Sequence, residues 1–365
     1  MIRVLHTESS MNLGGQELRV LAEMDGLAGR GYESALAARP GSRILDEAEK
    51  RGQKRYPVKM RGSLDPAAVA SFARIILRER IEIVNAHGSK DGWSAGLAAR
   101  LLGRKVVRSR HVANPIRAHF FGRLVYGPLC DVIVTTSESI KRGMAERGVD
   151  IEKIISVPTG VDTGRFNPGV EKGRLRAELG VGESVPLVGM VAVMRGDKGP
   201  DVFVRAAESA ASVLPDAVFV LAGDGWMRSR LEDMVSASPF RERIKLLGYR
   251  RDVPAILADL DVFCLPSLIP EGVPQAVLQA HAMRCPVIAS DIGGVDEVAI
   301  AGRTAMCVPP GDPDALAKAI TGLLRDRQGA NRLAEEGHRL VQDKYTLDGM
   351  LDRMDGVYRR LLGVR

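Results

Sequence analysis

The sequence predicts an α/β protein made of two doubly wound domains, each with a parallel sheet. Short aliphatic runs alternate with longer helical patterns along all 365 residues. Alternation of this kind is typical of parallel sheets that carry helices on both faces. A stretch dense in Gly, Pro and Asn, Pro158–Gly169, separates two series of such runs and indicates a linker. A chain of this length is expected to form two domains of ordinary size.

The first predicted domain spans residues 1–165. Helical patterns such as Gly15–Arg30 and Pro66–Arg80 fill the intervals between its strands. Its strands are expected at Arg3–His6, Glu82–Asn85, Lys105–Ser109, Val132–Thr135 and Ile154–Val157. Ligands of doubly wound sheets bind beyond the carboxyl ends of the strands. The loops that follow these strands are therefore candidate binding positions.

The second predicted domain spans residues 166–346, with helices such as Gly199–Val213 and Asp314–Arg325. Its strands are expected at Leu187–Val193, Ala217–Ala222, Ile244–Leu247, Val262–Leu265, Val287–Ser290 and Ala305–Val308. Two such domains that face each other would leave a cleft between them. A last helix, about residues 347–365, is expected to pack back on the first domain, although its periodicity does not show this.

The composition is that of a soluble globular protein, with 45% hydrophobic and 27% charged residues. No apolar run approaches the roughly 18 residues that a membrane-spanning helix needs. The first residues, MIRVLHTE, lack the apolar segment of a signal peptide. The four cysteines form no CxxC pair and are expected to be core residues in a reducing compartment. We therefore expect a cytoplasmic protein.

The positive charge is unevenly spread. The chain has a net charge of +7, and residues 1–165 carry all of the excess. This basic half could meet an acidic acceptor or the anionic inner face of the cytoplasmic membrane, or it could be a solvated surface. The segment Arg117–Tyr126 mixes basic and aromatic residues and leaves the same choice between a membrane or lipid-linked contact and an ordinary packed helix. Nucleic-acid binding is disfavoured, because no recognised module is present.

Two loops could hold a phosphate. Gly14 and Gly15 follow the first strand and open a helix, where backbone N–H groups can approach an anion. The pattern is not GxGxxG, so a nicotinamide cofactor has little support. In the second domain, Arg195 and Lys198 lie just past a buried strand at a helix start, and two cations there suit a diphosphate. A plain strand-to-helix turn and a solvated loop are the respective alternatives.

The stretch PEGVPQAVLQAHAMRCPVIASDIGG places one acid, Glu271, in front of a Gly-Val-Pro turn. The turn is expected to start a helix whose free N–H groups bind hydroxyls or phosphate. A carboxylate there can accept hydrogen bonds from sugar hydroxyls. Gln279 lies two helical turns later on the same side, so both side chains could touch one extended ligand. The alternative is that Glu271 caps the helix and Gln279 is an ordinary surface residue.

Three further loops carry candidate residues. His87 and His111 each follow a predicted strand and could carry a proton or donate a hydrogen bond, although a lone loop histidine is usually structural. Gly248-Tyr249-Arg250 follows another strand and could contact a nucleobase or be a simple connection. No nucleophile elbow supports a Ser-His-Asp hydrolase. No cluster has metal-ligand spacing.

The order and spacing of several motifs resemble the retaining, nucleotide-sugar-dependent glycosyltransferases of family 4. The motifs are GGQE, VPTGVDTGRFNP, RGDKG, LAGDG, PSLIPEGVPQAVLQAHAMRCPVIASDIGGVDEV and VPPGDPDALAKAI. The resemblance runs over essentially the full length and implies the GT-B fold, in which two Rossmann-like domains face each other across a cleft. It implies that the first domain binds the acceptor and the second the donor. SKDGW and RSRH are similar to a branch that builds lipopolysaccharide cores and other cell-surface glycans.

The resemblance also implies roles. Glu271 matches the first acid of an E-x7-E motif that contacts the donor sugar, Lys198 matches a diphosphate lysine, and His111 matches a histidine close to the sugar. The expected catalytic residues are Glu271, His111, Lys198 and Arg195. The expected donor-binding residues are Gly14, Gly15, Arg195, Lys198, Gly248, Tyr249, Arg250, Glu271, Gly272, Val273, Pro274 and Gln279. The expected acceptor-binding residues are His87, Arg110 and His111.

The sequence departs from the family pattern at two positions. Gln279 stands where a second acid usually holds the donor ribose. Val193 stands where an arginine is usual, five residues before Lys198, and Arg195 is a candidate replacement. Both departures leave the nucleotide preference open.

The expected function is retaining transfer of a hexose-type sugar from a UDP- or GDP-sugar to a glycan or lipid-linked acceptor, in cell-surface polysaccharide or lipopolysaccharide biosynthesis. No cofactor or metal is expected beyond the sugar nucleotide, because Arg195, Lys198 and helix N–H groups can stabilise the leaving diphosphate. The alternatives are a nucleotide-sugar 2-epimerase on the same fold and a non-catalytic sugar-nucleotide-binding protein. The sequence does not set the sugar, the acceptor, the linkage or the oligomeric state.

Overall fold

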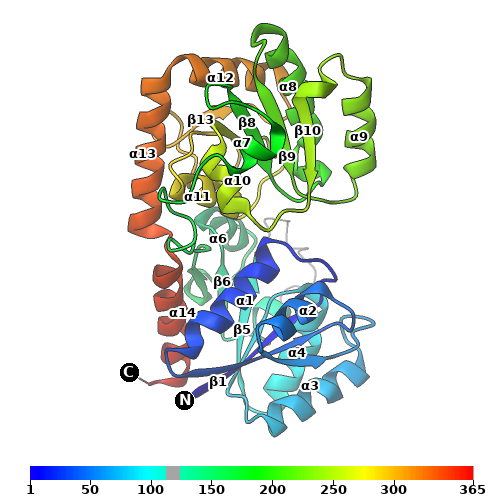
Figure 1. Ribbon diagram of the computed structural model, residues 1–365. Coiled ribbons are helices and arrows are strands. Elements are labelled where there is room, and N and C mark those ends of the chain that lie inside the picture. Colours follow the sequence, from blue (N-terminus) through cyan, green and yellow to red (C-terminus); the bar gives the residue numbers. More distant parts are fainter. Residues whose placement is uncertain (112–123, 365) are drawn as a thin grey trace. The chain divides into compact units, whose positions relative to one another are not determined.

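The computed structural model describes residues 1–111 and 124–364, which form two compact units (Figure 1). Unit 1 comprises Met1–Thr159 and the C-terminal segment from Asp348, and unit 2 comprises Gly160–Leu347. The boundary between Thr159 and Gly160 lies inside the stretch expected to be the linker. Each unit contains its own parallel sheet, which confirms the predicted α/β fold class. In this part of the chain, no helix has the length and apolarity needed to cross a membrane.

Unit 1 is built on a seven-stranded sheet with the order β3-β2-β1-β4-β5-β6-β7. All of its strand pairs are parallel. The strands are β1 (Ile2–Glu8), β2 (Tyr32–Ala38), β3 (Lys54–Pro57), β4 (Ile83–Ala86), β5 (Lys105–Arg110), β6 (Val132–Thr135) and β7 (Ile154–Ser156). The strand order reverses between the neighbouring strands β1 and β4, since β2 and β3 are added on one side and β5 to β7 on the other. A ligand is therefore expected at the loops that follow these two central strands.

Two strands of unit 1 were absent from the sequence prediction. The first, β2, reads YESALAA and is rich in alanine, which has a low β propensity. The second, β3, has only the four residues KRYP and lies at the edge of the sheet. Its charged, Pro-containing sequence suits an edge strand but gives no apolar run to detect.

The unit 1 helices cover the sheet and include the C-terminal helix (Figure 1). They are α1 (Gly15–Ala28), α2 (Arg43–Lys50), α3 (Pro66–Arg78), α4 (Ser89–Leu101), α6 (Glu138–Ala145) and α14 (Leu347–Leu362), with a 3₁₀ turn at Ile151–Lys153. Tyr358 of α14 is fully buried, and its hydroxyl donates to Glu23 Oε1 at 2.5 Å and accepts from Asn85 Nδ2 at 2.7 Å. The last residues of the chain thus complete the core of the first unit.

Unit 2 is built on a six-stranded sheet with the order β10-β9-β8-β11-β12-β13. The strands are β8 (Leu187–Val191), β9 (Val218–Ala222), β10 (Ile244–Gly248), β11 (Val262–Leu265), β12 (Val287–Ser290) and β13 (Met306–Val308). The helices are α7 (Arg174–Leu179), α8 (Pro200–Val213), α9 (Arg228–Ala237), α10 (Val253–Asp259), α11 (Gln275–Ala282), α12 (Pro313–Arg325) and α13 (Arg327–Lys344), with 3₁₀ turns at Gly196–Lys198 and Arg241–Arg243. The strand order again reverses between β8 and β11, which places a candidate site beyond their carboxyl ends.

Candidate active site

The loops after three strands of unit 2 are tied together at the carboxyl edge of the sheet. Leu268 N–H, after β11, donates to the carbonyl of Asp197, after β8, at 2.8 Å. Glu271 N–H donates to the carbonyl of Gly293, after β12, at 3.1 Å. The polar residues of loops that are distant in sequence therefore share one surface.

Two glycines allow these loops to approach one another. Gly294 has φ +86°, and a Cβ atom there would lie 1.8 Å from the carbonyl oxygen of Glu271. Gly199 has φ +65°, and its Cβ would lie 2.1 Å from the carbonyl oxygen of Pro266. Positive φ and the lack of a side chain are both properties of glycine. The glycines that follow Lys198 and precede Val295 are thus required by the backbone of the site.

Lys198 and Glu271, both predicted to be catalytic and to bind the donor, are in direct contact. Lys198 Nζ forms an ion pair with Glu271 Oε2, and the two side chains are 18% and 19% exposed. Ser267, which is fully buried, donates its hydroxyl to Glu271 Oε1 at 2.6 Å. Both carboxylate oxygens are therefore held, one by a cation and one by a hydroxyl. Ser267 was not predicted, because its role depends on a turn that the sequence alone does not show.

Helix α11 begins at Gln275, with Pro274 at its N-cap position, directly after the Gly-Val-Pro turn that the sequence predicted. Gly272 and Val273 therefore belong to the preceding turn. Glu271 is four residues ahead of the helix, and its side chain is engaged by Lys198 and Ser267, so it is not the helix cap. Gln279 is half-buried on α11.

The turn after β8 carries the other predicted cation of unit 2. Arg195 Nη2 forms an ion pair with Asp197 Oδ2 at 2.8 Å, and the Arg195 side chain is 49% exposed. Val193, at the position where the family pattern has an arginine, is an exposed apolar side chain. Arg195 is therefore held near Lys198 on the same short turn, with its guanidinium accessible to solvent.

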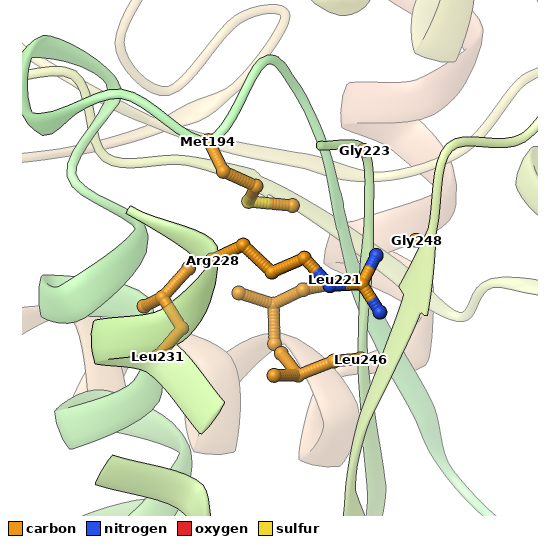
Figure 2. A pocket seen from close by; sticks show the side chains of 7 residues that line it. All are labelled: Met194, Leu221, Gly223, Arg228, Leu231, Leu246 and Gly248. Carbon is orange, nitrogen blue, oxygen red and sulfur yellow. The ribbon is translucent and has the colours of Figure 1, made fainter. Parts of the chain in front are cut away.

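A small pocket lies at the carboxyl ends of β8, β9 and β10, close to this turn (Figure 2). Its lining residues are Met194, Leu221, Gly223, Arg228, Leu231, Leu246 and Gly248. Figure 2 shows the Arg228 side chain extending along the pocket toward Gly248. Gly248 is a predicted donor-binding residue, and the neighbouring Tyr249 is exposed. The lining is apolar apart from the guanidinium of Arg228.

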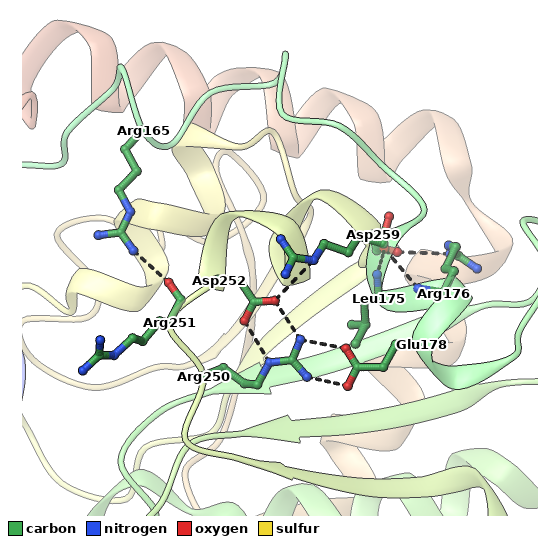
Figure 3. Close-up of polar contacts among 9 residues, drawn as sticks. Arg165, Leu175, Arg176, Glu178, Arg250, Arg251, Asp252 and Asp259 are labelled. Atoms are coloured by element: carbon green, nitrogen blue, oxygen red, sulfur yellow. Dashed lines mark hydrogen bonds and ion pairs between the residues drawn. The ribbon is translucent and has the colours of Figure 1, made fainter.

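Arg250, also predicted to bind the donor, is engaged within unit 2 (Figure 3). Its guanidinium donates to both oxygens of Glu178, at 2.6 and 2.8 Å, and to both oxygens of Asp252, at 2.8 and 2.7 Å. These hydrogen bonds raise the pKa of Arg250 and lower the pKa of Asp252 to about 2. A donor contact by the Arg250 side chain would require some of these bonds to break, so this role stays a prediction.

In unit 1, the backbone of the predicted phosphate-binding loop is hydrogen-bonded to a nearby acidic side chain. Helix α1 begins at Gly15, and the Gly14 N–H donates to Glu17 Oε2 at 2.8 Å. Glu8, at the end of β1, receives a hydrogen bond from Gln16 Nε2 at 2.5 Å. Burial, followed by the nearby charge of Asp91, raises the pKa of Glu8 to about 8. The contact of Gly14 and Gly15 with phosphates therefore stays a prediction, and the acidic neighbourhood was not foreseen.

Three histidines of unit 1 form a continuous chain. His6 Nδ1 lies 3.1 Å from His87 Nε2, and His87 Nδ1 lies 3.0 Å from His111 Nε2. The rings of His6 and His87 are stacked with an interplanar angle of 11°. His6 and His87 are buried and His111 is half-buried. His6 was not predicted, because a histidine inside an aliphatic strand gives no sequence signal of function.

Arg110, a predicted acceptor-binding residue, lies beside Tyr126. Its Nη1 donates to the Tyr126 hydroxyl at 2.8 Å, and Arg108 lies over the same ring. Burial raises the pKa of Tyr126, but the charges of Arg108 and Arg110 outweigh it and bring the pKa below its ordinary value. The rest of the predicted membrane or acceptor segment, residues 117–123, lies outside the described residues.

Comparison with known proteins identifies the family. A family model described as Glycosyltransferase Family 4 matches residues 13–165, and one described as Glycosyl transferases group 1 matches residues 185–326. Together they cover most of the chain. The chain belongs to the family 4 glycosyltransferases. This confirms the family predicted from the sequence motifs.

Among curated relatives of this family 4 glycosyltransferase, the Escherichia coli UDP-Gal:alpha-D-GlcNAc-diphosphoundecaprenol alpha-1,3-galactosyltransferase is 32% identical over 63% of the chain and 63% of the relative. The alpha-D-kanosaminyltransferase of Streptomyces kanamyceticus is 31% identical over 52% of the chain and 49% of the relative. A GDP-mannose-dependent mannosyltransferase of Mycolicibacterium smegmatis that acts on a phosphatidylinositol monomannoside is 27% identical over 76% of the chain and 70% of the relative. The chain thus spans 63% of the length of the first relative and 49% of the length of the second.

Solved structures share the fold of this family 4 glycosyltransferase. A glycosyltransferase from Rickettsia africae aligns with a TM-score of 0.88 at 20% identity, over 99% of this chain and 98% of the other. The Anabaena protein HepE, solved in complex with UDP, aligns with a TM-score of 0.84 at 18% identity, over 99% of this chain and 100% of the other. At these identities the likeness establishes the fold, and it confirms the predicted GT-B class.

No three His, Cys, Asp or Glu side chains of this family 4 glycosyltransferase gather as a metal site within residues 1–111 and 124–364. Metal-independent transfer stays a prediction. Lys198 and Arg195 are two of the cations that the structure places at the carboxyl edge of the unit 2 sheet.

Proposed function

We propose that this chain is a retaining glycosyltransferase that moves a hexose-type sugar from a UDP- or GDP-sugar to a glycan or lipid-linked acceptor of the cell surface. The observation that carries the proposal is the contact between Lys198 and Glu271, held by Ser267, beyond the carboxyl ends of β8 and β11. A cation for diphosphate and an acid for sugar hydroxyls stand side by side there. Unit 2 is then the donor unit and unit 1 the acceptor unit.

The Lys198–Glu271 pair suggests how the donor is received. A diphosphate carries more negative charge than one carboxylate, so it attracts the Lys198 ammonium away from Glu271. The released Glu271 carboxylate, still bonded to Ser267, accepts hydrogen bonds from hydroxyls of the sugar. Gln279 lies further along α11, where its amide can contact the ribose. Lys198 and Glu271 thus neutralise each other until a donor binds.

The transfer breaks the bond between the anomeric carbon and the β-phosphate oxygen. The acceptor hydroxyl oxygen forms the new bond on the same face of the sugar, and its proton passes to the leaving phosphate. Lys198, Arg195 and the first-turn N–H groups of α11 oppose the charge that develops on the diphosphate. Preorganised groups of this kind stabilise a transition state by roughly 2.7–4 kcal/mol each in comparable enzymes.

The names of the relatives support both the donor class and the acceptor class. One relative is named for UDP-Gal and another for GDP-mannose, so either base remains open. These two act on a diphosphoundecaprenol and a phosphatidylinositol glycan, which supports a lipid-linked acceptor. A lipopolysaccharide core mannosyltransferase of Rhizobium meliloti, 25% identical over 64% of the chain, supports the lipopolysaccharide branch. A lipid-linked acceptor places the enzyme at the inner face of the cytoplasmic membrane.

A panel of sugar nucleotides tests the proposal. The correct donor should raise the melting temperature, since ligand at about 100 times its dissociation constant adds roughly 2.7 kcal/mol. Free nucleoside diphosphate should appear only when an acceptor glycan or glycolipid is present. Conversion of the donor without any acceptor would instead support the 2-epimerase, and binding without turnover would support a non-catalytic role.

Substitutions at the pair test the site itself. Lys198→Ala and Glu271→Gln should each lower kcat/KM by about 100-fold, which corresponds to roughly 2.7 kcal/mol, while the proteins stay folded. Lys318→Ala, an exposed lysine on α12 of the same unit, is the matched control and should transfer normally. Near-normal turnover in either site variant would reject the assigned roles.

A further inference from the structure

The chain of three histidines in unit 1 constrains where its protons can be. A neutral imidazole has one N–H donor and one bare nitrogen acceptor. Both ring nitrogens of His87 are used, Nε2 toward His6 and Nδ1 toward His111. If His87 donates to His6, it must accept from His111, and the reverse holds if it accepts from His6. The three histidines therefore have two possible hydrogen-bond arrangements. The position of the proton on one ring determines its position on the other two.

The rings are neutral at physiological pH. Burial lowers the pKa of His6, and burial followed by neighbouring charges lowers the pKa of His87 and of His111 well below the ordinary value. His87 also lies beside Arg108 of β5, a further positive charge that opposes its protonation. The three histidine rings are consequently aligned neutral dipoles.

Two charged residues of α1 decide between the two arrangements. The negative charge of Glu23 acts on His6, at the inner end of the chain, and the positive charge of Arg19 acts on His87 and His111, toward the outer end. Glu23 and Arg19 are one helical turn apart, and both are buried. A carboxylate at the inner end favours an N–H there, and a guanidinium at the outer end favours a bare nitrogen. His6 Nε2 has no hydrogen-bond partner among the described residues, so it is free to carry that proton.

We propose that His6 and His87 are positioning residues that fix the tautomer of His111, with the proton of every ring on Nε2 and the bare Nδ1 of His111 presented to a hydroxyl group of a bound sugar. His111 is the contact residue, and the two inner rings act through it. The identity of the hydroxyl as part of a donor or acceptor sugar rests on the proposed function, whereas the tautomer does not.

Nitrogen-15 NMR of histidine-labelled protein tests the proton positions without any substrate. The chain has six histidines, so single substitutions suffice to assign the ring signals. At about pH 7.5 we expect the shifts of a bare Nδ1 and a protonated Nε2 for His111 and His87. A protonated Nδ1, or an even mixture of tautomers, would overturn the proposal.

Substitution of His6 tests whether this residue influences the tautomer of His111 through His87. His6→Phe removes the acceptor for His87 Nε2–H, and we expect His111 to become a mixture of tautomers. His6→Asn places an oxygen acceptor near the former Nδ1 and should restore the Nε2–H form. His338→Gln, in unit 2, is the control and should leave the His111 signals unchanged. An unchanged His111 tautomer in His6→Phe contradicts transmission along the chain.

A kinetic measurement links the tautomer to the proposed function. His6→Phe should lower kcat/KM for transfer by about ten-fold, the effect of one misoriented hydrogen bond, and His6→Asn should recover most of it. The dissociation constant of the free nucleoside diphosphate, which binds unit 2, should not change. If NMR shows the expected tautomers but no donor supports transfer, the proposed function is wrong, whereas the proposed control of the His111 tautomer by His6 and His87 is supported. If transfer occurs and His6→Phe is as active as the original protein, the hydrogen bonds from His6 through His87 to His111 have no role in transfer.

Discussion

Glu8 is a carboxyl group that the fold keeps protonated near neutral pH. In the unfolded chain its pKa is near 4.5, whereas in the folded protein burial and Asp91 raise it to about 8. Between these two values the folded state binds more protons than the unfolded state, so the free energy of unfolding falls as the pH rises, by about 1.4 kcal/mol per pH unit for one group. This contribution is complete below about pH 4.5 and is lost as the pH rises through 8.

Replacing Glu8 with its neutral isostere should remove this pH dependence. Glu8→Gln is expected to make the protein more stable at pH 8 than the original chain, and to show a flatter dependence of stability on pH between 5 and 8. Urea unfolding at several pH values measures both effects. Glu183→Gln, an exposed residue of unit 2, is the control. If Glu8→Gln follows the same pH profile as the original protein, Glu8 is ionised in the fold.

A charged side chain that follows a buried strand can be recognised in the sequence as a candidate site residue. Lys198 and Glu271 fall in this class, and the structure places them in contact. Ser267 and His6 do not, because a serine in a turn and a histidine in a strand acquire a role only through partners supplied by other segments. For Arg250, no sequence pattern indicated the two carboxylates that hold it, those of Glu178 and Asp252.

At the scale of elements, the double glycine after β12 controls the position of the Glu271 loop. Gly294→Ala would place a methyl group 1.8 Å from the Glu271 carbonyl oxygen and force a side chain at φ +86°. The loops must then move apart, at a cost of about 1–3 kcal/mol for the backbone conformation alone. We expect both a lower stability of unit 2 and weaker binding of the donor nucleotide.

A second glycine separates these two effects. Gly302 has φ +68°, and a Cβ there meets no atom within 4 Å. Gly302→Ala should therefore cost only the conformational part, about 1 kcal/mol, and leave nucleotide binding intact. Urea unfolding and nucleotide titration of the two variants measure the difference. Equal nucleotide affinity in both variants would show that Gly294 does not position the Glu271 loop.

The predicted elements agree best where the chain is aliphatic and buried. The strands at Val132–Thr135, Val262–Leu265 and Val287–Ser290 were predicted with their observed bounds, and the last helix, expected at about residues 347–365, spans Leu347–Leu362. The strand expected at Leu187–Val193 ends earlier, at Val191, because the apolar Val193 belongs to the turn that carries Arg195. Local sequence thus predicts regular elements better than it predicts the turns that carry the chemistry.

At the scale of the whole molecule, the alternation of strands and helices was enough to predict two doubly wound sheets. It was not enough to show where α14 packs, because an amphipathic pattern does not name its partner surface. That partner is decided by contacts such as those of Tyr358 with Glu23 and Asn85, more than 270 positions away in the chain.

Removing the Tyr358 hydroxyl tests the importance of this long-range contact. Tyr358→Phe keeps the buried ring but leaves Glu23 without this donor and Asn85 without this acceptor. Loss of one partner of a buried polar group costs about 1–3 kcal/mol, so we expect a lower free energy of unfolding for unit 1. Tyr249→Phe, at an exposed position of unit 2, is the matched control and should have no measurable effect. Equal stability of the two variants would rule out a structural role for the hydroxyl.

The return of α14 to unit 1 has a consequence for biosynthesis. The N-terminus of a nascent chain emerges from the ribosome first, and domains generally fold as they emerge. Unit 2 is one continuous segment, so it can complete its sheet while the last residues are still inside the ribosome. Unit 1 has to wait with an uncovered core until Tyr358 emerges, even though most of it was translated first. During this interval it is the half of the nascent polypeptide most in need of a chaperone.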